Sequence, residues 1–161
     1  MSLLDVIFNR ASVRRYRRES VPREVLMNIL EAGRRAPSAM NAQPWHFIVI
    51  TDKKIKEALS HRRWTDFLRD AAFIIVGCGE KDKKWSTVDV SIALQNMVLA
   101  AEAQGLGSCW IGDFDESEVK KLLGILDDLK VVALISFGYP AEKPKPRPKK
   151  PLEQIVHYNK F

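Results

Sequence analysis

Two segments of the chain combine residue types that could bind a small organic molecule. The stretch from Ala36 to Trp45 contains two prolines, a serine, an asparagine, a glutamine and a tryptophan. Side-chain amides and a hydroxyl on a rigid apolar frame can hydrogen-bond the edge of a flat heterocycle. Arg10, Ser12 and Arg14 alternate, so in an extended segment they project to one side. Because guanidinium groups match the oxygens of a phosphate, the two segments together predict a site for a phosphorylated ring cofactor.

A further basic segment lies near the C-terminus, where lysine and arginine alternate with proline between Pro140 and Pro151. This composition predicts an extended arm that wraps a surface. Lys145, Arg147 and Lys149 could then close on a phosphate group from the side opposite the first cluster. The alternative for each basic segment is a solvated surface that binds nothing.

The composition is that of a soluble globular protein, and we expect one domain over residues 1–161. Hydrophobic residues make up 46% and charged residues 29% of the chain, and no apolar run is long enough for a membrane span. The N-terminus shows no secretory signal. Cys78 and Cys109 have neither CxxC spacing nor a histidine companion, so we expect reduced, buried thiols in a cytoplasmic protein.

The net charge of +6 would suit a protein that binds nucleic acid. However, the basic residues are scattered apart from 10–18, 53–63 and 143–150, and aromatic residues do not alternate with them as in single-strand-binding proteins. We therefore expect no nucleic-acid partner, and a basic module for anionic partners is kept only as an alternative. No spacing predicts a metal site or a catalytic triad.

Hydrophobic periodicity predicts helices that alternate with single strands, which is typical of an α+β fold. Helices are expected over 3–9, 22–35, 52–59, 64–70, 86–104 and 115–124, with a last helical turn in 152–157. Strands are expected over 46–50, 73–78, 109–112 and 131–137. The helix over 86–104 is apolar almost all round, so it should be central. In the first helix, the side chains expected to face inward are Leu3, Leu4, Ile7 and Phe8.

Four segments, in the same order along the chain, resemble the nitroreductase family of flavin mononucleotide (FMN) enzymes. They are Arg10-Ala11-Ser12-Val13-Arg14, Ala36-Pro37-Ser38-Ala39-Met40-Asn41-Ala42-Gln43-Pro44-Trp45, Gly105-Leu106-Gly107-Ser108-Cys109-Trp110-Ile111-Gly112 and Lys145-Pro146-Arg147-Pro148-Lys149-Lys150-Pro151-Leu152-Glu153. The resemblance spans nearly the whole chain. It implies an α+β three-layer sandwich, with a mostly antiparallel central sheet flanked by helices, in an intertwined homodimer.

The resemblance also implies which residues bind FMN. Those implied at the phosphate and ribityl chain are Arg10, Ala11, Ser12, Arg14, Lys145 and Arg147. Lys149 is the alternative for the tail pair, because the proline spacing leaves the register open. Those implied at the flavin ring, usually donated by the other subunit, are Pro37, Ser38, Ala39 and Asn41. Asn41 could instead cap its own turn, and Gln43 is expected to stabilise the loop or the interface rather than contact the flavin.

The flavin face opposite the substrate is implied to meet Trp110, Ile111 and Gly112, with the Gly112 backbone N–H directed at the flavin N5. Many relatives carry glutamate at this position, but a backbone donor needs no side chain. Asp89 lies where relatives place an amide or an acid near the ring. The alternative is that Asp89 is a negative charge favoured by the dipole at a helix N-terminus.

The implied activity is passage of hydride from NAD(P)H through flavin N5 to a small conjugated acceptor, such as a nitroaromatic or a quinone, by ping-pong exchange. No side chain is assigned as a catalytic acid or base, since the cofactor carries the redox chemistry. Dehalogenation, flavin breakdown and cofactor synthesis are alternatives on the same fold. The segment 61–67 occupies the region of a substrate lid, where Trp64 and Phe67 either line the pocket or pack in the core.

Overall fold

A four-stranded antiparallel sheet forms the centre of the protein, and the computed structural model describes residues 2–161. Its strands are β1 (Trp45–Ile50), β2 (Phe73–Glu80), β3 (Gly107–Ile111) and β4 (Leu129–Gly138), in the order β1-β2-β4-β3. In the central pair, Ile75 of β2 lies opposite Ile135 of β4. Both central strands are runs of branched and aromatic apolar residues, which suits strands that are covered on both faces.

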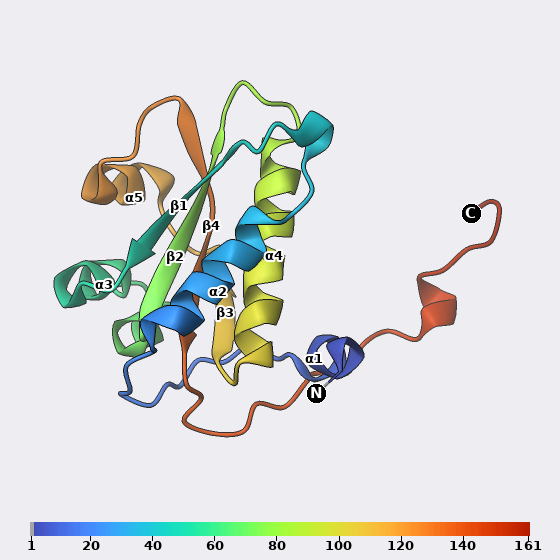
Figure 1. Ribbon diagram of the computed structural model, residues 1–161, viewed down its shortest axis with the longest axis horizontal. Helices are drawn as coiled ribbons and strands as arrows, with labels where there is room; N and C mark the ends of the chain where they lie inside the picture. Colours follow the sequence, from blue (N-terminus) through green and yellow to red (C-terminus); the bar gives the residue numbers. More distant parts are fainter. Residues whose placement is uncertain (1) are drawn as a thin grey trace.

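Helices cover both faces of the sheet, which confirms the expected α+β three-layer sandwich (Figure 1). One layer contains α2 (Arg23–Arg34) and α4 (Ser86–Ala103), and the other contains α3 (Lys53–Leu59), the 3-10 helix η2 (Asp66–Asp70) and α5 (Glu116–Leu123). Successive side chains of β2 serve different layers, since Ile74 packs with Leu68 while Ile75 packs with Met97. The period of two along the strand therefore builds two hydrophobic cores.

The predicted central position of α4 is confirmed. Val90, Leu94 and Met97 are fully buried between the sheet and α2. Gly33 of α2 permits this close approach, because a Cβ added there would overlap the Met97 side chain. Within residues 2–161, none of the helices is long and apolar enough to span a bilayer.

The helix ends follow signals that are visible in the sequence. At the start of α3, Asp52 Oδ1 accepts a hydrogen bond of 2.9 Å from the Ile55 amide. At the start of α5, Asp115 Oδ1 accepts one of 3.0 Å from the Glu118 amide. Gly124 ends α5 in the left-handed conformation, with φ of 65°, which glycine adopts without a steric penalty.

The helix expected over 64–70 is shorter than predicted and is the 3-10 helix η2. The reason lies in the preceding turn, where the Thr65 hydroxyl both accepts from the Arg62 amide and donates to the Arg62 carbonyl. A threonine that bonds the local backbone in this way offers the chain an alternative to the helix. Regular structure therefore begins only at Asp66.

The expected inward orientation of four residues in α1 (Leu3–Asn9) is wrong. Those residues, all exposed on the chain, are Leu3, Leu4, Ile7 and Phe8. Only Val6 of this helix is buried, because α1 packs on the body along one narrow edge near the end of α4.

The C-terminal tail leaves the sheet beside the N-terminal segment. Tyr16 forms a bridge with Pro140, and the Ala141 amide donates to the Arg15 carbonyl over 2.9 Å. The tail then crosses the segment that follows α1. Beyond Pro151 it includes the short 3-10 helix η3 (Leu152–Gln154) and stands away from the body (Figure 1). The expected extended arm and last helical turn are therefore both present.

Candidate functional site

The segment from Arg10 to Arg14 is held against the edge of the sheet at β3. Ser12 forms a parallel bridge with Ser108, and the Val13 amide donates to the Ser108 carbonyl over 2.9 Å. Ala11 and Val13 are buried, so the alternate residues Arg10, Ser12 and Arg14 must face outward. The predicted one-sided arrangement of these three polar side chains is confirmed.

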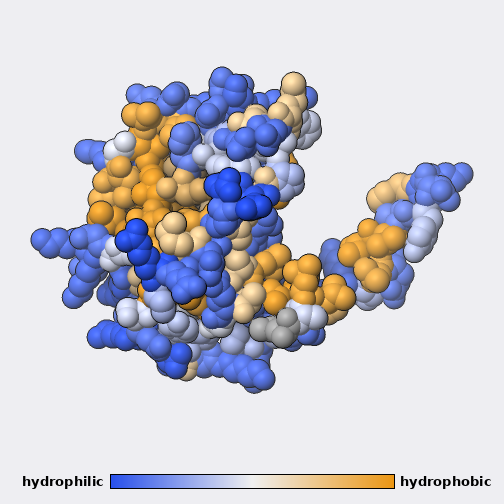
Figure 2. Space-filling model, in the orientation of Figure 1, coloured by the Kyte–Doolittle hydropathy of each residue, from blue (hydrophilic) through white to orange (hydrophobic). Residues whose placement is uncertain are grey.

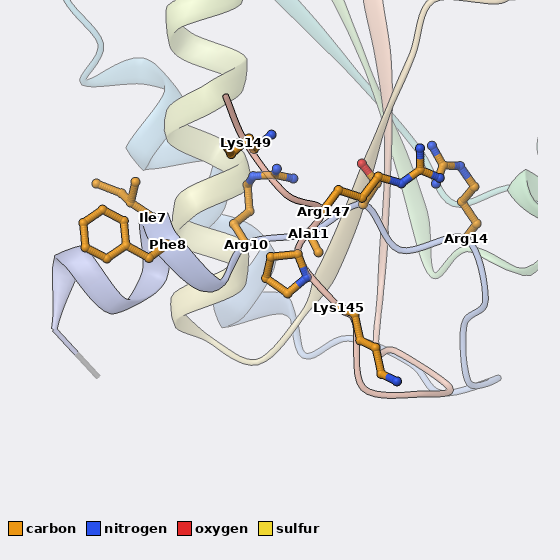
Figure 3. A pocket seen from close by; sticks show the side chains of 10 residues that line it. Ile7, Phe8, Arg10, Ala11, Arg14, Lys145, Arg147 and Lys149 are labelled. Atoms are coloured by element: carbon orange, nitrogen blue, oxygen red, sulfur yellow. The ribbon is translucent and has the colours of Figure 1, made fainter. Parts of the chain in front are cut away.

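The outward face of this segment and the tail enclose a cavity of about 470 Å³, which we call the basic cavity. Its polar lining consists of Arg10, Ser12, Arg14, Lys145, Arg147 and Lys149. Figure 3 shows the guanidinium groups of Arg14 and Arg147 directed toward each other, with Arg10 and Lys149 together on the other side of Ala11. The structure thus assembles all the cations predicted for a phosphate, and both Lys149 and the Lys145–Arg147 pair contribute.

The five cations of the basic cavity are not neutralised by their own chain. Within residues 2–161, no salt bridge involves any of them. Arg10 acts on the buried carboxyl of Glu102, whose pKa is raised by burial although Arg10 opposes the rise. Like charges held together without a counter-charge favour an anion between them. Paired arginine forks suit the oxygens of a phosphate in particular.

A second cavity, of about 430 Å³, opens beside the end of β3 and is called the aromatic cavity. It is lined by Trp64, Thr65, Phe67, Cys109, Trp110, Ile111, Gly112 and Asp113, together with Arg14 and Arg147 of the basic cavity. The two cavities are therefore neighbours that share two arginines. The exposed backbone of Gly112 forms part of this lining, and a Cβ added there would meet nothing within 4 Å. The site thus has room for a flat group against the strand end.

Cys109 lines the aromatic cavity but is not poised as a nucleophile. Burial raises the pKa of its thiol, although Arg14, a hydrogen bond from Ser12 and Arg10 act in the opposite direction. The thiolate is the reactive form of cysteine, so this residue is expected to be inert at neutral pH. Its position instead shows how close the basic segment lies to β3.

The predicted ring-binding loop is well formed but strained. It contains the 3-10 helix η1 (Ala39–Asn41), and Met40, Asn41 and Gln43 all have φ between 50° and 54°. Residues other than glycine adopt this left-handed region only when their surroundings impose it. The Gln43 amide donates to Ser38 Oγ over 3.0 Å, and Gln43 Nε2 donates to the Asn41 carbonyl over 3.1 Å. The expected role of Gln43 in stabilising the loop is confirmed.

Asp89 holds this loop onto α4. Its side chain is only 4% exposed, and its Oδ1 accepts a hydrogen bond of 3.2 Å from the Ala39 amide. Neither alternative for Asp89, direct cofactor contact or a helix-terminal charge, foresaw this bond across 50 residues of sequence. The structure therefore gives Asp89 a positioning contact with the predicted ring-binding loop.

The loop and the basic cavity lie at opposite ends of α4 in one chain (Figure 1). Asp89 and the loop are at the N-terminal end, whereas Arg10 approaches Glu102 near the C-terminal end. At 1.5 Å per residue, these two positions on α4 are roughly 20 Å apart. One chain therefore brings the residues predicted to bind the phosphate together with Trp110, Ile111 and Gly112. The other residues predicted near the ring lie away from them, namely Pro37, Ser38, Ala39, Asn41 and Asp89.

Two charged residues near the aromatic cavity were missed in the sequence. Asp113 lines the cavity, and Arg62 forms an ion pair with it over 3.3 Å. Asp113 directly follows the Trp110–Gly112 motif, and this adjacency was a usable signal. No local pattern could have indicated Arg62, because its partner lies 51 residues away.

Comparisons with known proteins agree over almost the whole chain. The profile described as Nitroreductase family matches residues 7–64 and 57–139. An iodotyrosine deiodinase from Thermotoga neapolitana is 33% identical over 186 aligned positions, which cover 99% of this chain and 98% of that protein. An NADH dehydrogenase from Thermus thermophilus is 33% identical, with 91% of each chain covered. The solved structure of an FMN-dependent nitroreductase from Clostridium difficile matches with a TM-score of 0.88 at 31% identity, covering 98% of this chain and 99% of that one.

Proposed function

This chain belongs to the nitroreductase family, and on that premise we propose that it is an FMN-dependent oxidoreductase that carries electrons from NAD(P)H to a small conjugated acceptor. One observation carries the proposal, namely that the basic cavity and the aromatic cavity share Arg14 and Arg147. A ligand with a phosphate at one end and a flat ring at the other would occupy both. FMN has this shape and charge, and one solved relative is named for its dependence on FMN.

The residues present fit an FMN phosphate. A phosphate dianion would offset part of the charge of the five uncompensated cations, and the Ser12 hydroxyl offers an additional donor. Arg14 and Arg147 would bind between the phosphate and the ring, since they line both cavities. The tail cations would act together with the N-terminal segment, because both reach the same cavity from different parts of the chain.

The chain's contribution to the reaction would be binding, orientation and charge. When bound, FMN would accept a hydride from NAD(P)H and supply two electrons to the acceptor. The Gly112 N–H would offer a preorganised donor at the ring, a role that depends on the backbone and not on a side chain. Arg14 and Arg147 would favour negative charge nearby. No residue is assigned as a general acid or base.

We propose a homodimer in which each FMN lies between two chains. The strained loop around Asn41 cannot reach the basic cavity of its own chain, because α4 separates them by roughly 20 Å. A second copy that runs antiparallel along α4 would bring its loop to that cavity. The predicted ring contacts of Pro37, Ser38, Ala39 and Asn41 would then be made across the interface.

The exposed apolar surface supports the same dimer. Figure 2 shows apolar side chains gathered over α1 and along the tail. On α1, Leu3 and Phe8 are among the exposed apolar residues, and on the tail Leu152, Ile155 and Phe161 are exposed as well. A contiguous apolar surface of this kind is typical of an interaction site. An arm that projects from the body can pack on a second copy, as in domain swapping.

Reductive dehalogenation of an aromatic compound is a second candidate. It is favoured by the similarity to the iodotyrosine deiodinase, which covers 99% of this chain. The reaction would use the same donor. An aryl iodide would gain a hydrogen in place of iodine, iodide would leave, and NAD(P)H would be oxidised to NAD(P)⁺. The two free thiols, Cys78 and Cys109, fit a reducing compartment such as the cytoplasm for either activity.

The test is a visible absorbance spectrum of the purified protein, recorded before and after anaerobic addition of NADH or NADPH. We expect a flavin spectrum that bleaches with one or both donors and returns when menadione, a nitroaromatic or an iodophenol is added. The acceptor that restores the spectrum fastest distinguishes the two candidates. If no flavin is bound even after incubation with excess FMN, the assignment is wrong.

A further inference from the structure

A third cavity, of about 330 Å³, lies between the N-terminal segment and the start of the tail, and we call it the tail cavity. It is lined by residues 12–15 and 142–145. Arg14 lines the basic, aromatic and tail cavities alike. Ser12 and Lys145 line both the basic and the tail cavity. The tail cavity therefore adjoins the site that we propose for FMN.

Backbone contacts fix the two segments of the tail cavity relative to each other. Tyr16 forms a bridge with Pro140. The Ala141 amide donates to the Arg15 carbonyl over 2.9 Å. The Arg15 side chain also forms an ion pair with Glu142 over 3.4 Å, and both side chains are well exposed. Because an exposed ion pair contributes little to stability, an anionic ligand can replace Glu142 as the partner of Arg15.

The lining of the tail cavity has a net positive charge. Among the described residues it contains one acid, Glu142, and four cations, which are Arg14, Arg15, Lys143 and Lys145. Neither Lys143 nor Lys145 takes part in a salt bridge within residues 2–161. The two ammonium groups are therefore available to an anion that enters the tail cavity.

The basic and tail cavities together hold more positive charge than one FMN phosphate can offset. The five cations of the basic cavity are joined by two more in the tail cavity, Arg15 and Lys143. A phosphate monoester brings only about two negative charges at neutral pH. Figure 3 shows the Lys145 side chain directed away from the guanidinium groups of Arg14 and Arg147. Lys143 and Lys145 can therefore bind a second anion while the arginines hold the first.

The hydride donor of the proposed function supplies such an anion. NADH and NADPH share a nicotinamide and a pyrophosphate, but only NADPH carries a further phosphate on the 2′-oxygen of its adenosine ribose. We propose that the tail cavity binds this 2′-phosphate through Lys143 and Lys145, and that the protein thereby selects NADPH over NADH. The proposal rests on the proposed function, and it adds which donor is used and which residues select it.

Charge favours the 2′-phosphate over the pyrophosphate that both donors carry. Each phosphate of the pyrophosphate bears one negative charge, whereas the 2′-phosphate is a monoester that bears about two. The attraction by a positively charged lining is proportional to the charge of the ligand group. Glu142 weakens this attraction, because its carboxylate lies among the cations and pairs with Arg15. Removing the Glu142 charge should therefore strengthen the preference for NADPH.

The experiment compares the two donors on the FMN-loaded protein. With menadione as the acceptor, kcat/KM is measured for NADPH and for NADH, and the wild type should use NADPH several-fold better. Lys143→Gln should lower the ratio of the two values about tenfold, with the loss confined to NADPH. Glu142→Gln should raise the same ratio. The Kd for FMN should stay unchanged in both variants.

Binding without turnover gives a second measurement. Adenosine 2′,5′-bisphosphate and 5′-AMP differ only in the 2′-phosphate, so calorimetry with the oxidised, FMN-loaded protein isolates its contribution. The bisphosphate should bind more tightly to the wild type, and Lys143→Gln should remove this difference. If inorganic phosphate binds as tightly as the bisphosphate, the cavity is a site for free phosphate and the proposal is wrong.

Lys150 provides a matched control on the same tail. It is exposed, lines none of the three cavities and forms no salt bridge with any described residue. Lys150→Gln should leave the donor ratio unchanged. Equal losses with NADPH and NADH in Lys143→Gln would assign the cavity to the pyrophosphate, and a higher Kd for FMN would assign it to the flavin phosphate. Either result would overturn the proposal, whereas a failure of the proposed function would be visible earlier, as a wild-type protein that binds no flavin.

Discussion

The contact between Asp89 and the loop at residues 38–43 leads to a prediction that can be worked out in detail. Asp89 Oδ1 accepts the Ala39 amide over 3.2 Å and is nearly buried. In the variant Asp89→Leu, the Ala39 N–H would lose its partner at a partly buried position. Leaving such a donor unpaired costs about 1–3 kcal/mol. The folded loop already carries a conformational free-energy cost, because Met40, Asn41 and Gln43 adopt left-handed conformations.

A loss of about 2 kcal/mol in loop order corresponds to a roughly 30-fold increase in the Kd for FMN, if the loop contacts the cofactor. FMN fluorescence quenching, titrated against each variant, measures this Kd. Asp89→Asn is the control, because its side-chain oxygen can still accept from Ala39, and its Kd should stay within about threefold of wild type. Thermal unfolding of the FMN-free protein should change little in Asp89→Leu, since the buried carboxylate that is removed was itself costly to desolvate.

Either of two results would refute this reasoning. If Asp89→Leu and Asp89→Asn bind FMN equally well, the Ala39 hydrogen bond does not control the loop. If Asp89→Leu loses FMN affinity only in proportion to a large fall in its unfolding temperature, the residue supports the whole fold rather than the loop.

Three further predictions follow from the site. Arg14→Gln should raise the Kd for FMN about tenfold and weaken the dependence of this Kd on salt concentration. Arg15→Gln should change neither, because Arg15 lines neither the basic nor the aromatic cavity. Equal effects of the two variants would contradict a specific phosphate contact. Gly112→Ala should leave the unfolding temperature and the Kd for FMN unchanged, because the added Cβ meets nothing within 4 Å; a tenfold weaker Kd would show that the space is needed. Burial raises the pKa of Cys78 to about 11 and also raises that of Cys109, so neither thiol should react quickly with a disulfide reagent at pH 8. Both should react after denaturation, and fast reaction of the native protein would contradict their burial.

Much of the fold could be predicted from local patterns. The alternation of Arg10, Ser12 and Arg14 with buried Ala11 and Val13 required one polar face, since side chains alternate along extended backbone. The apolar run of β2 and the all-round hydrophobicity of α4 predicted central elements, and both are buried. The polar face and the apolar elements could be predicted because they depend on residues only a few positions apart. Backbone dihedral preferences and the periodicity of side chains act over the same short distance along the chain.

The outward position of α1 could not be predicted in the same way. Leu3, Leu4, Ile7 and Phe8 have the composition of a core-facing helix, but periodicity does not say whether the covering surface belongs to the same chain. Similarly, the sequence predicted a helix that included Trp64, and it could not show that the bonds between Thr65 and Arg62 would delay regular structure until Asp66.

The arrangement of the candidate site depended on packing between residues far apart in the chain. The tail cations reach Arg10 and Arg14 because the chain returns beside Tyr16 after β4. Asp89 meets Ala39 only because α2 packs on α4. Helix α4 also separates the loop at residues 38–43 from the basic cavity, since the two lie at its opposite ends. Residue types along the chain thus indicated which groups could bind a phosphate and a ring. Their distances from one another were set by how the helices pack on the sheet, because local backbone preferences do not specify the separation of remote segments.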